Sequence, residues 1–136
     1  MSEATLLEEL KKEVERVEKT RVRLYSISWI DMFNGRRGEE RYVEGVKITD
    51  GKLLNILADA IDIIHGKSGT RVDFVVVTDK DIIVQWHRDA YNPYGSYVGT
   101  TYSYMSLREI IRRLREVKTP NAEELINRLK DAVAQL

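Results

Sequence analysis

The sequence contains no cysteine and no apolar run that approaches the length of a membrane span. Without cysteine there can be no disulfide and no thiolate metal site, which suits a reducing compartment. A membrane-spanning helix needs about 20 mainly apolar residues. The N-terminal segment MSEATLLEELKK carries acidic residues where a signal peptide requires basic ones. We therefore expect a cytoplasmic protein that does not insert into membranes.

A net charge is also missing, because 22 Lys and Arg residues balance 22 Asp and Glu residues. The chain therefore has no overall basic field to attract nucleic acid and no acidic tail. Its charged content of 32% exceeds the typical figure of about 25%. Together with only two glutamines, this composition is typical of a thermophilic source. A length of 136 residues predicts a single domain with its own core.

The order of hydrophobic periods predicts an α+β fold with the element order α-β-β-α-β-β-β-α-α. Apolar residues that recur every three or four positions indicate helices, and alternating ones indicate strands. We expect a five-stranded antiparallel sheet with helices packed on its faces, a core region over 5–117 and an additional C-terminal helix over 120–136. The expected helices cover 5–19, 52–64, 107–117 and 120–136, and the expected strands cover 21–33, 40–48, 71–77, 82–88 and 96–104.

The helix over 52–64 is apolar around most of its circumference. On a helical wheel its apolar residues cover an arc of roughly 220°, and Asn55, Asp59 and Asp62 occupy the remainder. A helix that docks on a sheet needs an apolar stripe of little more than about 100°. The excess must be covered by a second copy of the chain or by a terminal helix of the same chain. We expect a homodimer, and the alternative stays open.

Candidates for catalysis or metal binding are few. His87 and Asp89 lie two positions apart on a strand, so both side chains can point to one face. No third ligand lies nearby in the sequence, and a structural role is the simpler interpretation. The segment from Gly35 to Gly38 carries two arginines but lacks the Lys and Ser/Thr of a P-loop. We expect no catalytic residue, no metal and no cofactor.

Tyrosines and arginines are concentrated between residues 91 and 115. Five of the seven tyrosines lie between residues 91 and 104, just before an arginine stripe on the next helix. Aromatic and Arg side chains together can bind single-stranded nucleic acid, because bases stack and phosphates pair. The same residue types anchor protein–protein interfaces, and strand tyrosines can also simply cover a sheet. The candidate partner surface comprises Arg36, Arg37, Tyr94, Tyr97, Tyr102, Arg108, Arg112 and Arg115.

The element order, together with the segments LLEELKKEVERV, KLLNILADAIDII, RVDFVVVTDKDIIVQW and SLREIIRRLREV, resembles the Roadblock/LC7 family of the dynein-light-chain type. The resemblance covers about residues 5–117. It implies a protein that is not an enzyme and that dimerises through its central helix and the neighbouring strand, as a platform for small Ras-like GTPases. The implied dimer interface comprises Leu54, Ala58, Ile61, Val75 and Val77.

We therefore expect a non-enzymatic protein–protein interaction domain, a homodimeric scaffold or regulator of a small GTPase. The alternative is a single-stranded nucleic-acid-binding protein that uses the Tyr/Arg surface.

Overall fold

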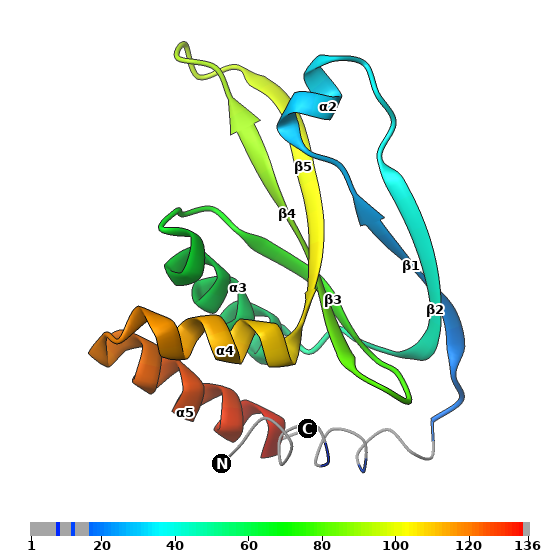
Figure 1. Cartoon of the computed structure of the whole chain (residues 1–136), viewed down its shortest axis with the longest axis vertical. Coiled ribbons are helices and arrows are strands. Elements are labelled where there is room, and N and C mark those ends of the chain that lie inside the picture. Colours follow the sequence, from blue (N-terminus) through cyan, green and yellow to red (C-terminus); the bar gives the residue numbers. More distant parts are fainter. Residues whose placement is uncertain (1–7, 9–11, 13–16, 135–136) are drawn as a thin grey trace.

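A computed structural model describes residues 8, 12 and 17–134 of the chain. Over these residues it shows a five-stranded antiparallel sheet in the order β1-β2-β3-β4-β5 and four helices (Figure 1). The expected α+β fold is confirmed, whereas most of the helix expected over 5–19 lies outside the described residues. The elements are β1 (Thr20–Ser26), α2 (Trp29–Phe33), β2 (Glu39–Ile48), α3 (Gly51–His65), β3 (Arg71–Val77), β4 (Ile82–Tyr91), β5 (Tyr97–Ser106), α4 (Leu107–Val117) and α5 (Pro120–Ala134).

The sheet is curled so strongly that its first and last strands meet. Just beyond β1, Ile27 exchanges two backbone hydrogen bonds with Tyr102 of β5, at 3.0 and 3.1 Å. On the other side, β2 pairs with β3 over only three residue pairs. A Cβ atom at Gly45, where β2 reaches β3, would lie 2.4 Å from the carbonyl oxygen of Val77. Glycine is therefore required at this close approach between the two strands.

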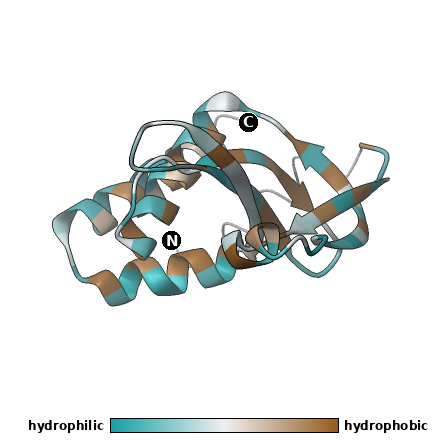
Figure 2. Ribbon diagram, turned by 90° about the horizontal axis from the view of Figure 1, so that it is seen from above, coloured by the Kyte–Doolittle hydropathy of each residue, from teal (hydrophilic) through white to brown (hydrophobic). Residues whose placement is uncertain are grey.

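Apolar residues form two cores on opposite faces of the curled sheet. A small cluster joins residues of β1 to residues of β3 and comprises Val22, Leu24, Phe74 and Val76. The larger cluster joins the other face of β3 and β4 to α3, α4 and α5. Along these helices apolar residues recur at intervals (Figure 2), as expected where one face is buried and the other is exposed. No helix among the described residues is both long and apolar enough to cross a membrane.

The C-terminal helix α5 covers α3 within the same chain. Leu125, Leu129 and Val133 of α5 are buried in the cluster that also holds Ile56 and Ala60 of α3. The wide apolar arc of α3 thus packs against the sheet and against the protein's own tail (Figure 1). Of the two coverings that the sequence left open, the structure shows the one within a single chain. The arc therefore no longer argues for a second copy.

Three residues of the expected dimer interface are buried inside this chain. Ile61 and Val75 are fully buried and Val77 is 2% exposed. In addition, β3 lies between β2 and β4, and it is paired on both sides over its last three residues. These residues cannot meet a second copy while α4 and α5 stay in place. Leu54 and Ala58 are half-buried.

The first expected strand, 21–33, is wrong in its second half. β1 ends at Ser26, and residues 29–33 form the short helix α2. Ser28 caps this helix, since its Oγ accepts a hydrogen bond from the backbone N–H of Asp31 at 3.2 Å. The residues of this segment favour strands in general. After the isolated bridge at Ile27, however, the cap at Ser28 starts a helix instead.

Candidate functional site

Four of the five residues of the short helix α2 are apolar, yet every residue of this helix is at least partly exposed. Trp29 and Phe33 stack on each other with ring centroids 5.5 Å apart and an interplanar angle of 16°. Ile30 is 63% exposed and Phe33 is 77% exposed. In globular proteins a short helix normally gains its stability by burying an apolar face. The chain's own core therefore does not account for the apolar side chains of α2.

One contact with β5 fixes the position of α2. The side chain of Met32 rests on Gly99, where a Cβ atom would lie 2.9 Å from the Met32 methyl carbon. Gly99 also has a φ of +152°, a conformation that side-chain-bearing residues rarely adopt. Because Ile27 is bridged to Tyr102 of the same strand, the segment before α2 is held as well. Together the Met32–Gly99 contact and the Ile27–Tyr102 bridge hold α2 against β5.

The turn between β4 and β5 presents further aromatic side chains beside α2. The carboxamide oxygen of Asn92 accepts hydrogen bonds from the backbone N–H groups of Tyr94 and Ser96, at 3.0 and 2.9 Å. The N–H of Gly95 donates to the carbonyl of Asn92 at 3.0 Å, which closes the turn. Because the Asn92 carboxamide and backbone groups hold the turn, the Tyr94 side chain takes no part in it and is 93% exposed.

Between α2 and this turn lies a pocket of about 370 Å³. Its lining comes from both elements: Trp29, Met32, Phe33, Tyr91, Asn92, Pro93 and Val98. The pocket joins the exposed apolar side chains of the two elements into one surface at the end of the molecule opposite α4 and α5 (Figure 1). We call this surface the aromatic end and define it by Trp29, Ile30, Phe33, Tyr91, Tyr94, Tyr97 and Val98.

The aromatic end is large for a protein that works alone. Its five aromatic residues are between 47% and 93% exposed, and each offers roughly 200 Å², so together they expose roughly 700 Å². The largest apolar patch of a typical monomer is about 300–600 Å² and is often functional. The aromatic end is therefore the strongest candidate for a functional site among the described residues.

The cations near the aromatic end are arginines. Its residues lie within the stretches 20–46 and 81–106, which contain no lysine, although the chain has nine lysines elsewhere. Protein–protein interfaces are enriched in Tyr, Trp, Phe, Met and Arg and depleted of Lys. The composition of this end therefore resembles that of protein–protein interfaces.

Comparison with protein-family models, with curated proteins and with solved structures finds no match to this chain. The family resemblance in element order thus stays a prediction, and the case for function rests on the aromatic end itself.

The Tyr/Arg surface expected from the sequence is divided between the two ends of β5. Tyr94 and Tyr97 belong to the aromatic end, and Arg36 and Arg37 follow α2. Tyr102 is instead half-buried, with its ring edge-on to Tyr25 at 5.2 Å. The three remaining arginines, Arg108, Arg112 and Arg115, lie on α4 at the far end of the strand (Figure 1).

On α4 the expected arginine stripe is partly neutralised. Arg112 donates hydrogen bonds to Glu109 and Glu116, and Arg113 donates to Glu109 at 2.9 Å. These hydrogen bonds from the two guanidiniums lower the pKa of Glu109 to about 2. Arg112 is therefore occupied within its own helix rather than free for a phosphate.

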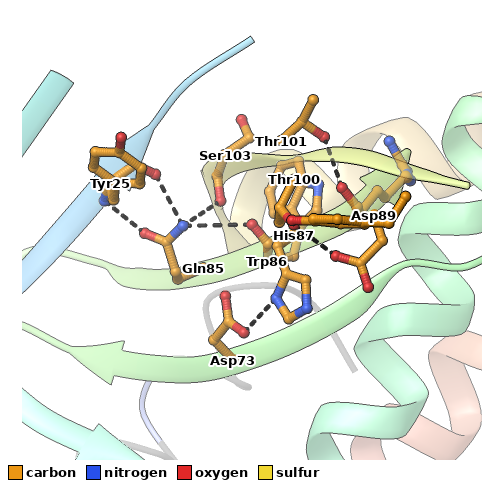
Figure 3. A network of polar contacts seen from close by, with 11 residues as sticks. Tyr25, Asp73, Gln85, Trp86, His87, Asp89, Thr100, Thr101 and Ser103 are labelled. Carbon is orange, nitrogen blue, oxygen red and sulfur yellow. Dashed lines mark hydrogen bonds and ion pairs between the residues drawn. The ribbon is translucent and has the colours of Figure 1, made fainter. Parts of the chain in front are cut away.

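His87 has a different partner from the one its spacing suggested. Its Nδ1 lies 2.6 Å from a carboxylate oxygen of Asp73 on β3, whereas Asp89 accepts a hydrogen bond from the Thr100 hydroxyl at 2.7 Å (Figure 3). The β3–β4 register shifts between Val72 and Phe74, which leaves Asp73 as an extra residue facing His87. Burial raises the pKa of Asp73, and the charge of His87 opposes this rise. No group of three potential ligands for a metal occurs among the described residues.

Gln85 closes the gap between β1 and the β4–β5 pair. This side chain is 2% exposed. Its carboxamide oxygen accepts from the backbone N–H of Tyr25 at 2.8 Å, and its NH₂ group donates to the carbonyls of Tyr25 and Ser103 at 2.9 Å each (Figure 3). Residue types alone do not indicate this role, because the partners are backbone groups of distant residues. We call this contact, together with the Ile27–Tyr102 bridge, the β1–β5 seam.

The other histidine, His65, is the last residue of α3 and contacts Arg88 of β4. Arg88 donates from its guanidinium to His65 Nδ1 at 2.7 Å and to the Thr70 hydroxyl at 2.7 Å. Because an arginine can only donate, His65 accepts at Nδ1 and carries its proton on Nε2. Burial, followed by the charge of Arg88, lowers the pKa of His65. This cluster fastens the α3–β3 loop to β4 and is structural.

Proposed function

We propose that the chain is a non-enzymatic, cytoplasmic protein–protein interaction domain, with the aromatic end as its binding surface. The observation that carries the proposal is α2, whose apolar residues Trp29, Ile30 and Phe33 are left exposed by their own chain. The adjoining pocket of about 370 Å³ has room for an apolar side chain of a partner. A few aromatic side chains that become buried when two proteins bind usually supply most of the binding energy of the interface.

Peptide display offers a direct test. A library of random peptides is panned against the immobilised protein and, in parallel, against the Phe33→Ala variant. We expect peptides with a large apolar residue to be enriched on the wild type and lost on Phe33→Ala. The matched control is Tyr42→Ala, which removes an aromatic side chain that is 46% exposed but lies outside the aromatic end. Peptides that bind the wild type and Phe33→Ala equally well would refute the proposal.

Single-stranded nucleic acid is the second candidate, and the exposure of the aromatic side chains of Tyr94 and Tyr97 favours it. Base stacking on aromatic side chains combined with phosphate contacts should give affinity that falls steeply with salt. Titration with a labelled oligonucleotide at about 50 and 200 mM salt distinguishes the two functions. Salt-dependent binding that Tyr94→Ala and Tyr97→Ala weaken would favour nucleic acid over protein.

A small GTPase is the partner that the family resemblance implies. A pull-down with GTPases loaded with GDP or with a GTP analogue tests this prediction. Capture that depends on the nucleotide and is lost in Phe33→Ala would identify the partner class. Capture that is unchanged in Phe33→Ala would place the GTPase on another surface.

A further inference from the structure

The edge of the aromatic end carries both signs of charge. Arg36 and Arg37 are exposed, and neither guanidinium has an ion-pair partner among the described residues. Asp31 lies within α2, and Glu39 is exposed at the start of β2. Two basic and two acidic groups thus lie within or just after α2, which forms one side of this apolar surface. A strongly acidic or strongly basic partner would match only half of them.

A second copy of the same chain matches both signs. In a symmetric twofold interface the same patch meets itself, so each residue contacts a different residue of the other copy reciprocally. The arginines of one copy can then face the acidic groups of the other. The chain's formal net charge is zero at pH 7, so two copies do not repel each other at long range.

The exposed area is sufficient for such a contact. The roughly 700 Å² of the aromatic side chains, together with Ile30 and Val98, reaches the roughly 800 Å² that each partner contributes to a standard interface. The interface expected from the sequence, on α3 and β3, is filled by the chain's own helices. The aromatic end remains as the surface with the area and composition for self-association.

We infer that the partner of the aromatic end is a second copy of this chain, and that Tyr94 of each copy enters the pocket of the other. This inference rests on the proposed function, since it names the partner of the same surface. Tyr94 stands at the tip of its turn and is 93% exposed. The pocket beside Phe33 has about 370 Å³, which is room enough for its ring. The two reciprocal insertions would place α2 of each copy against the other's β4–β5 turn.

Analytical ultracentrifugation over a range of concentrations tests the inference. We expect the wild type to sediment as a species of twice 15.8 kDa at micromolar concentration. Tyr94→Ala and Phe33→Glu should weaken the dimer at least tenfold. Tyr42→Ala, the matched control, should leave the dimer unchanged. Circular dichroism melts verify that each variant is folded, which is expected because both side chains are exposed.

A second measurement follows the interface directly. The chain has two tryptophans, Trp29 in the aromatic end and the buried Trp86, which is 4% exposed. Dilution of the wild type through the dimer–monomer transition should expose Trp29 and increase its quenching by acrylamide. Tyr94→Ala should show the dilute-state quenching at all concentrations.

The outcomes separate the two proposals. A monomeric wild type at about 100 μM would overturn the second-copy inference, and peptide enrichment on the aromatic end would still support the interaction domain. A dimer that persists in both Tyr94→Ala and Phe33→Glu would also overturn the inference, because the copies would then meet elsewhere. A monomer that enriches no peptide would overturn both proposals.

Discussion

Replacing Gln85 with leucine tests the β1–β5 seam. Leucine has nearly the same size but neither accepts nor donates hydrogen bonds. The variant would leave the N–H and carbonyl of Tyr25 buried without the partners that lie 2.8 and 2.9 Å away. The carbonyl of Ser103 would lose its 2.9 Å contact as well.

The expected loss of stability follows from these groups. A buried polar group without a partner costs about 1–3 kcal/mol, and the apolar leucine recovers part of that cost. We expect the free energy of unfolding to fall by about 2–4 kcal/mol. The unfolding entropy of a chain of 136 residues converts each kcal/mol into roughly 3.5 °C, so the melting temperature should fall by about 10 °C.

Urea denaturation followed by circular dichroism measures the change in unfolding free energy. Thr101→Val is the matched control, since it removes a single long hydrogen bond of 3.3 Å on the same pair of strands. We expect this control to cost less than about 1 kcal/mol. If Gln85→Leu lost no more than Thr101→Val, the seam would not depend on the Gln85 carboxamide and the reasoning would be refuted.

Gln85→Glu adds a pH-dependent comparison. A buried carboxylate can accept from the Tyr25 N–H but faces two carbonyls to which only a protonated acid can donate. Burial raises the pKa of such a group, so its destabilising effect should shrink as the pH falls. Gln85→Leu should show no such recovery relative to the wild type. Parallel urea titrations at pH 5 and pH 8 give the result.

Three further changes probe other parts of the fold. Gly99→Ala places a Cβ 2.9 Å from the Met32 methyl and strains the backbone, so it should cost about 1–3 kcal/mol and move α2, which Trp29 fluorescence detects. Leu129→Ala opens a cavity between α5 and α3 and should lower the unfolding free energy by about 2–5 kcal/mol in urea titrations. In the folded state, burial raises the pKa of Asp73 above its usual value of 3.8. The free energy of unfolding should therefore fall as the pH rises from that value and Asp73 ionises. Asp73→Asn should flatten this part of the curve of unfolding free energy against pH.

The elements with strong periodicity and local caps were predictable from the sequence. The helix over 107–117 has the predicted bounds, and Ser106 caps it by accepting from the N–H of Glu109. The prediction of a strand through residue 33 was wrong at residues 29–33, which form α2. It rested on aromatic residues that favour strands in general. The signal for α2 was present, since Ser28 followed by Asp31 has the spacing of a helix cap.

Contacts between distant segments had no such signal. The Gln85 carboxamide binds the backbone of a strand 60 residues away, and a backbone partner leaves no mark in the residue types. The pairing of His87 with Asp73 depends on an irregularity in the β3–β4 register. The apolar arc of α3 indicated that something covers it, but an arc alone cannot distinguish the chain's own α5 from a second copy.

The β1–β5 seam also connects stability to binding. Gln85 fixes Tyr25, the Ile27 bridge follows two residues later, and α2 begins two residues after that. Loosening the seam should therefore displace α2 and deform the aromatic end. Leu129→Ala supplies a comparison of similar expected destabilisation, because its cavity lies in the opposite core.

If this coupling exists, Gln85→Leu should weaken self-association, measured by sedimentation well below the melting temperature, several-fold more than Leu129→Ala. Both variants remain mostly folded under these conditions, so global unfolding does not explain a difference between them. Equal association of the two variants would show that α2 is held by the Met32–Gly99 contact alone. In that case Gly99→Ala, rather than Gln85→Leu, would be the substitution that disrupts the surface.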